Sequence, residues 1–186
     1  MCKLTNIEFY NTPDGEVMVK KIGEAAVTFK ETDREFISEM LSIINDRYPK
    51  AYKKLMELHS VSSMNRTHYE YEVVHHFIRC NFGEYDQFNH DINAFGQFIF
   101  EEVKCPLRGH CKYEGVICKP ELDTQLTERE MEVFRLLATH MSIDDIAEEL
   151  SISKFTIIRH KENIKSRLNC KKVSELIAYW HDNNLR

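Results

Sequence analysis

The sequence lacks the features that mark membrane, secreted and many catalytic proteins. No stretch approaches the roughly 18 consecutive apolar residues that a membrane span needs, and the first residues, MCKLTNIEFY, contain no signal-peptide core. A glycine-rich phosphate loop, paired catalytic carboxylates and an HExxH metal helix are also missing. We therefore expect a cytoplasmic protein that is not an enzyme and has no membrane partner.

The chain also has little excess positive charge. It contains 25 lysine and arginine residues against 30 aspartate and glutamate residues, a net charge of -5. A protein that is acidic overall binds a polyanion only where its positive charge is concentrated. Residues Ser153 to Lys172 hold seven basic residues and one acid, Glu162. The ten residues before them hold four acids and no lysine or arginine. We expect DNA to meet the basic segment; the alternative is a solvated helix face.

Three successive helices are predicted in the last third of the chain. Thr127 with Glu130 forms a capping box, Ser142 with Asp145 repeats the cap signature, and Ser153 can cap a third helix. Apolar residues recur at three- and four-residue spacing in each segment, which predicts an amphipathic helix. These positions are Met131, Val133, Phe134, Leu137 and Ala138, then Ile143, Ile146, Ala147 and Leu150, then Ile157, Ile164 and Leu168.

These helices resemble the LuxR-type family of bacterial helix-turn-helix domains over one continuous stretch without gaps. The resemblance implies an all-α four-helix bundle whose fourth helix runs from Val173 to about Asn183. In that family the fourth helix often forms a dimer contact, here through Leu176, Ile177 and Trp180, or these residues are ordinary core. The matching residues are Leu126, Thr127, Arg129, Glu130, Glu132, Val133, Ile146, Ala147, Leu150, Ile152, Ser153, Thr156, Ile157, His160, Asn163, Ile164, Arg167 and Leu168.

The resemblance also implies which side chains contact double-stranded DNA. Two lie near phosphate oxygens, three face base edges in the major groove, and two add backbone contacts. An arginine can hold guanine by two bonds and a glutamate can accept from a cytosine amino group. The residues near phosphate oxygens are Lys154 and Thr156, those facing base edges are Ile158, Arg159 and Glu162, and those adding backbone contacts are Lys161 and Lys165.

Two positions depart from the family pattern. The chain has His140 where the family commonly has glycine, and Ile143 and Asp144 where it has Asn-Lys or Asn-Arg. Histidine is among the more tolerated residues in a left-handed conformation. We expect a slightly strained turn that leaves the reading helix intact.

The first 120 residues predict a separate α+β domain. Alternation between Ile7 and Phe29 around Pro13-Asp14-Gly15 predicts a β-hairpin. A long helix opening near Thr32 should break at Pro49, and another should run from Arg66 to Arg79. Aromatic-rich strands are expected around 95–103, and this order of elements argues against a phosphoacceptor receiver, which needs alternating strands and helices. The boundary falls between Lys119 and Thr124, which gives domains 1–120 and 121–186.

Four of the six cysteines lie between Cys80 and Cys118 with the spacing C-x24-C-x5-C-x6-C. Cysteines grouped in a turn-rich segment of a cytosolic chain favour a metal site over a disulfide. Cys80, Cys105, Cys111 and Cys118 are the expected ligands of zinc or an iron–sulfur cluster, with His110 as a substitute ligand. The alternative is that they are reduced, buried side chains. Cys2 and Cys170 fit no such group.

The segment around these cysteines, CNFGEYD and CPLRGHCKYEGVICKP, resembles the N-terminal region of small LuxR-type regulators from Bacteroides-type bacteria. A catalytic pairing of Cys105 or Cys111 with His110 lacks any accompanying catalytic motif. His75 and His76 are expected to be packing or surface residues. The N-terminal domain is therefore interpreted either as a structural unit whose fold is stabilised by a bound metal or as a sensor whose metal or redox state changes DNA affinity.

Together these patterns predict a sequence-specific transcriptional regulator. We expect it to bind a pseudo-palindromic site as a homodimer and to act on the transcription machinery. The alternative is an adaptor whose N-terminal domain recruits another protein, with DNA contact secondary.

Overall fold

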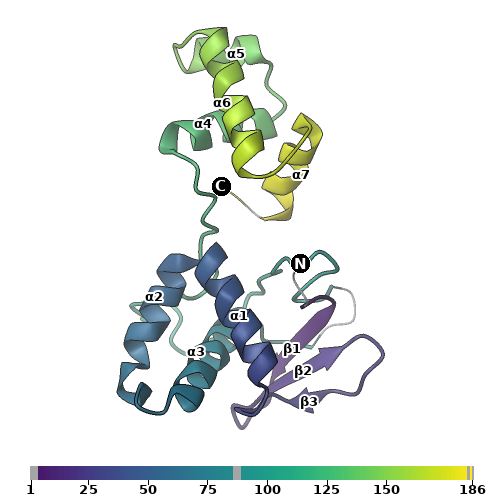
Figure 1. The fold of residues 1–186 in the computed structure, drawn as a ribbon, viewed down its shortest axis with the longest axis vertical. Coiled ribbons are helices and arrows are strands. Elements are labelled where there is room, and N and C mark those ends of the chain that lie inside the picture. Colours follow the sequence, from purple (N-terminus) through teal and green to yellow (C-terminus); the bar gives the residue numbers. More distant parts are fainter. Residues whose placement is uncertain (1–3, 86–88, 184, 186) are drawn as a thin grey trace. The chain divides into compact units, whose positions relative to one another are not determined.

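The computed structural model describes residues 4–85, 89–183 and 185, and the chain separates into two compact units, residues 1–121 and 122–186 (Figure 1). The first unit is α+β and the second is all-α, as the sequence predicted. None of the helices in the described part of the chain is long and apolar enough to span a bilayer.

The N-terminal unit begins with a three-stranded antiparallel sheet in the order β1-β2-β3. Phe9 pairs with Val19 across the first hairpin, and both side chains are buried. The predicted turn closes it: Thr12 accepts from the N–H of Gly15 at 2.9 Å, and Gly15 has φ 89°. Such a φ is readily adopted only by glycine. The strands are β1 (Ile7–Asn11), β2 (Val17–Lys21) and β3 (Val27–Thr28).

Helices stand together beside this sheet in Figure 1. Pro49 is the first residue of the second helix, where its missing N–H removes no helical bond, and it ends the preceding helix as predicted. Their buried faces include Ile37, Leu55 and Phe77. The elements are α1 (Arg34–Arg47), α2 (Pro49–Leu58), the short η1 (Ser60–Ser62) and α3 (Arg66–Asn81).

The prediction of strands around 95–103 was wrong. This segment forms only an isolated bridge between Ile92 and Phe98, and its aromatic side chains join a cluster of rings instead. The ring centre of Phe98 lies 5.9 Å from that of Phe77, and Phe98 stacks on Tyr48 with 5.8 Å between ring centres. Alternating aromatic residues can bury one face of an extended segment without a neighbouring strand. The alternation therefore did not show that this segment forms the hydrogen bonds of a β-sheet.

Several histidines of the N-terminal unit are packed in a neutral form. His76 Nδ1 lies 2.9 Å from His59 Nε2, and His75 stacks on Phe29. Burial, followed by the positive charges of His59 and Arg79, lowers the pKa of His76 to about 4. Burial also lowers the pKa of His59 and of His75. In each case an imidazolium is disfavoured because water is largely excluded.

The free energy of unfolding of the N-terminal unit is therefore expected to decrease as the pH falls from about 6.5 to about 4. In that window the unfolded chain binds a proton at His76 that the folded chain does not, so stability is lost as pH decreases. Hydrogen-exchange mass spectrometry of α3 peptides, corrected for intrinsic exchange rates, measures the loss. His76→Gln should flatten the pH dependence. An unchanged slope in that variant would show that His76 is not responsible.

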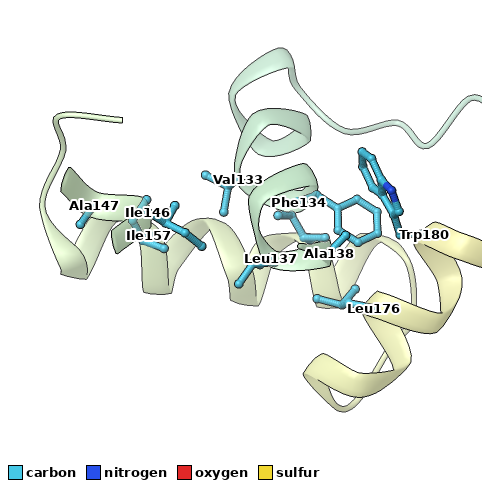
Figure 2. Packing of buried hydrophobic residues seen from close by; sticks show 10 residues of the cluster. Val133, Phe134, Leu137, Ala138, Ile146, Ala147, Ile157, Leu176 and Trp180 are labelled. Carbon is cyan, nitrogen blue, oxygen red and sulfur yellow. The ribbon is translucent and has the colours of Figure 1, made fainter. Parts of the chain in front are cut away.

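The C-terminal unit is the expected four-helix bundle (Figure 1). Figure 2 shows its core, where Trp180 meets Phe134 edge-on at 4.9 Å and Leu176 is fully buried. Leu176 and Trp180 therefore belong to the core, where they pack against α4, whereas Ile177 on the same helix is only half-buried. The helices are α4 (Glu128–Ala138), α5 (Ile143–Glu149), α6 (Lys154–Arg167) and α7 (Val173–Asp182).

The predicted caps set where α4, α5 and α6 begin. Thr127 Oγ1 accepts from the N–H of Glu130, and the Glu130 carboxylate accepts from the N–H of Thr127 at 2.9 Å. Ser142 accepts from the N–H of Asp145 at 3.2 Å, and Ser153 accepts from Thr156 at 3.1 Å. These bonds satisfy N–H groups that a helix start leaves unpaired.

Glu130 also joins the first and third helices of the bundle. Its side chain is 3% exposed, and its Oε2 accepts from Arg167 Nη1 at 2.8 Å. Although burial opposes the charged form, the bonds from Thr127 and the nearby Arg167 lower the pKa of Glu130. The carboxylate is thus ionised and held at three points, which fixes α6 against the start of α4.

Candidate functional site

Helix α6 presents one face to the core and another to solvent. Ile157 and Ile164 are fully buried, and they anchor the helix in the bundle. Residues about half a turn away project outward: Phe155 is 84% exposed and Ile158 is 40% exposed. Arg159 is exposed too, and it makes no ion pair or hydrogen bond with any side chain in the described residues. This face offers a free guanidinium flanked by apolar groups.

One carboxylate, Glu162, holds two half-buried lysines that flank this face. Lys165 Nζ lies 2.9 Å from one oxygen of Glu162, and Lys161 Nζ lies 3.6 Å from the other. The hydrogen bond from Lys165, together with the charges of both lysines, lowers the pKa of Glu162. In this structure the carboxylate of Glu162 therefore offsets much of the positive charge of these two lysines.

The start of α6 combines a cap with a charged link. Thr156 Oγ1 lies 2.8 Å from Ser153 Oγ, so its hydroxyl stays at the first turn. Lys154 Nζ forms a 2.8 Å ion pair with Asp144 of α5, and both side chains are largely exposed. A helix start attracts phosphate through its free N–H groups, but Asp144 places a competing negative charge beside Lys154.

The four predicted cysteine ligands lie in one region of the N-terminal unit. Cys80, at the end of α3, shares a side-chain hydrogen bond with Cys118. That bond lowers the pKa of Cys118 to about 7 and, with burial, raises the pKa of Cys80, so Cys118 ionises first. Cys105 and Cys111 lie near enough to act electrostatically on Cys80.

The cysteines do not form a ready-made metal cage. Within residues 4–85, 89–183 and 185, no three His, Cys, Asp or Glu side chains are already arranged to hold a metal ion. His110 is exposed. Cys170 lies in the C-terminal unit, where its thiol donates to the Leu168 carbonyl at 3.6 Å, and Cys2 falls outside the described residues.

Comparison with known proteins identifies the C-terminal unit. Residues 124–180 match the family model of the bacterial regulatory proteins of the luxR family. The C-terminal unit carries a LuxR-family domain. The match covers less than a third of the chain, and no solved structure matches significantly.

Curated relatives match between a third and a half of the chain. The chain is 39% identical over 72 residues to the HTH-type transcriptional regulator DctR of Escherichia coli O6:H1, covering 38% of the chain and 41% of the relative. It is 44% identical over 63 residues to the Fimbriae Z protein of Salmonella typhimurium, covering 34% and 30%. It is 34% identical over 91 residues to the response regulator protein VraR of Staphylococcus aureus, covering 48% and 41%. The chain thus spans about two fifths or less of these relatives.

The turn between α4 and α5 of the LuxR-family domain accommodates the expected departure. His140 has φ 63°, the left-handed conformation that glycine adopts more easily, and its N–H donates to Leu137 at 3.0 Å. Met141 donates to Leu136 at 3.3 Å, which completes the capping of α4. The prediction of a left-handed histidine is confirmed, and the next helix begins normally.

Phe155 was not among the predicted DNA contacts, although the helical spacing of α6 places it on the outward side with Arg159. It lies one turn before Arg159 and is 84% exposed, which is unusual for so large an apolar group. Apolar side chains contact the thymine methyl group in the major groove. Its spacing from Arg159 was the signal that could have added it to the predicted contacts.

Proposed function

We propose that this chain is a cytoplasmic, sequence-specific transcriptional regulator that inserts α6 into the major groove of double-stranded DNA. The outward face of α6 carries the proposal, because Arg159 has no ion pair or hydrogen bond among the residues that the structure describes and lies beside exposed Phe155 and Ile158. Similarity to the luxR family over residues 124–180 supports it. The activity needs no catalytic group.

Each residue of this face has a distinct proposed role. Arg159 reads a guanine edge, and Glu162 accepts from a cytosine once Lys161 and Lys165 move to phosphates. Ile158 and Phe155 contact apolar base edges. Lys154 and Thr156 position the start of the helix on the phosphate backbone.

We infer that two copies bind together on a pseudo-palindromic site. Symmetric helix-turn-helix dimers read half-sites about 34 Å apart, one turn of DNA. Leu176 and Trp180 fill the bundle core, so the contact between copies uses other surfaces. In this proposal the N-terminal unit adjusts DNA binding or contact with the transcription machinery.

Enrichment of bound sequences from a pool of random DNA duplexes tests the proposed function with the intact chain. The expected result is a motif with two related half-sites and an affinity that falls as salt rises, because bound lysines and arginines release counterions. Binding that shows no sequence preference would contradict the proposal. It would instead favour the adaptor hypothesis, in which the N-terminal unit recruits another protein.

Asp144→Asn is expected to strengthen DNA binding. The change removes the carboxylate that lies 2.8 Å from Lys154 Nζ, so the lysine becomes free to contact a phosphate. We expect an affinity gain of about twofold to tenfold on every duplex sequence and a steeper salt dependence. Fluorescence anisotropy at several salt concentrations measures both. Asp145→Asn, at the neighbouring position, is the control; equal gains in the two variants would indicate only a general charge effect.

A further inference from the structure

The segment from Glu101 to Glu121 is folded with very little hydrophobic core. It forms no helix or strand, only an isolated bridge between Glu114 and Cys118. Ile117 and Pro120 are its only buried residues. Long irregular segments are uncommon inside compact domains, and chain regions with little core usually depend on a cross-link. Hydrophobic burial alone leaves this segment weakly held.

A buried asparagine fastens one end of the segment beside α3. Asn81 is fully buried; its Nδ2 donates to the Ile117 carbonyl at 2.9 Å, and its Oδ1 accepts from the N–H of Lys119 at 2.6 Å. These bonds clamp the residues on either side of Cys118. Because Cys80 precedes Asn81 in the helix, these bonds fix the backbone around Cys118 at the end of α3 that carries Cys80.

The other two cysteines lie on a small loop built from local turns. Cys105 accepts from Arg108 at 3.1 Å and Cys111 accepts from Glu114 at 3.1 Å through their backbone carbonyls. The Glu114 carboxylate accepts from the N–H of Gly109 at 2.7 Å, so the loop is tied mainly to itself. The loop is therefore built mainly from its own local hydrogen bonds.

We propose that Cys80, Cys105, Cys111 and Cys118 together bind one zinc ion. This site goes beyond the DNA-binding proposal and does not rest on it. Binding converts four thiols to thiolates and releases their protons, while Zn²⁺ keeps its oxidation state. The loop around Cys105 and Cys111 closes onto the pair at the end of α3, and the metal replaces the missing hydrophobic core.

The donor set suits a single zinc ion. Four thiolates are a common ligand set of tetrahedral structural zinc sites. An iron–sulfur cluster uses the same kind of ligands, so the iron content of the purified protein separates the two.

Basic side chains offset the charge of such a site. Four thiolates and one Zn²⁺ carry a net charge of -2, and the guanidinium of Arg108 acts on Cys118. Arg108 is held near the site, because its Nη2 donates to the Val103 carbonyl at 2.7 Å. Lys119 adjoins Cys118 in the chain.

Metal analysis of the intact chain tests this site. The protein is purified without oxygen or added metal, and zinc and iron per chain are measured by elemental mass spectrometry. The chelator-stripped protein is then titrated with Co²⁺. The expected results are about one zinc per chain and cobalt spectra with thiolate charge-transfer and tetrahedral d–d bands. Several irons per chain, or no bound metal and no thiolate bands, would overturn the proposal.

Serine variants assign the ligands. Cys105→Ser and Cys118→Ser should each weaken zinc binding by at least about tenfold, whereas Cys170→Ser, in the other unit, should retain one zinc. Equal losses in all three variants would overturn the assignment, as would a Cys80–Cys118 disulfide in the oxygen-free protein. If a variant fails to fold, the cobalt spectrum of the unaltered chain still decides, because its thiolate absorption scales with the number of sulfur ligands.

Discussion

Glu130→Ala is expected to destabilise the C-terminal unit by about 2–3 kcal/mol. The change removes the capping bond to the N–H of Thr127, worth about 1 kcal/mol, and the buried bond from Arg167. Arg167 is 43% exposed and can be hydrated, so the loss stays below that of stranding a fully buried charge. In a unit of this size the melting temperature should fall by roughly 10 °C or more.

The fluorescence of Trp180 isolates this effect. It is the only tryptophan in the sequence and lies in the C-terminal core, so its urea transition reports on that unit. Glu132→Ala is the matched control, because Glu132 is an exposed residue of the same helix that pairs with Arg129. Its cost should stay under about 1 kcal/mol. Equal costs for the two variants would show that the buried network contributes little.

Arg159→Ala is expected to weaken binding to the enriched DNA site by about 1–3 kcal/mol, roughly fivefold to 150-fold, and to relax the preference at one base pair. The arginine is exposed on α6 and makes no contact with other described side chains that would hold the fold together. The loss should therefore appear in recognition, because a bidentate contact to guanine is removed.

Lys165→Ala provides the contrast for Arg159. Removing the lysine side chain should weaken binding to all DNA sequences by a similar factor. It should also reduce the slope of log affinity against log salt concentration by about one. Repeating the enrichment with each variant separates the two roles. If Arg159→Ala kept the unaltered base preference, Arg159 would not be the base-reading residue.

Local patterns were the most reliable guide to structure. The capping box of Thr127 and Glu130 and the serine caps depend on residues three positions apart, so the chain specifies them without tertiary contacts. The break at Pro49 follows in the same way from backbone chemistry, whereas the left-handed His140 was expected from the glycine that LuxR-type domains commonly have at this position. The outward face of α6 was predictable because the spacing of apolar residues sets which side is buried.

Predictions that needed a partner far away in sequence were less secure. The aromatic residues near Phe98 were expected in strands but pack as rings against α3. The pairing of Glu162 with two lysines was not foreseen, since opposite charges in neighbouring turns also fit a solvated face. For Leu176 and Trp180, an apolar helix face fits either a core or an interface, and only packing against Phe134 decides.

The amino-acid sequence was enough to predict the first three helices of the C-terminal unit, their starting points and the outward side of α6, because each depends on residues within one or two turns of each other. The fourth helix was expected from the family resemblance. Which distant residues meet is known only from the folded structure. It places Arg167 on Glu130 across 37 positions, and Asn81 on the residues that flank Cys118. Such contacts are selected by the packing of the whole chain rather than by any local pattern.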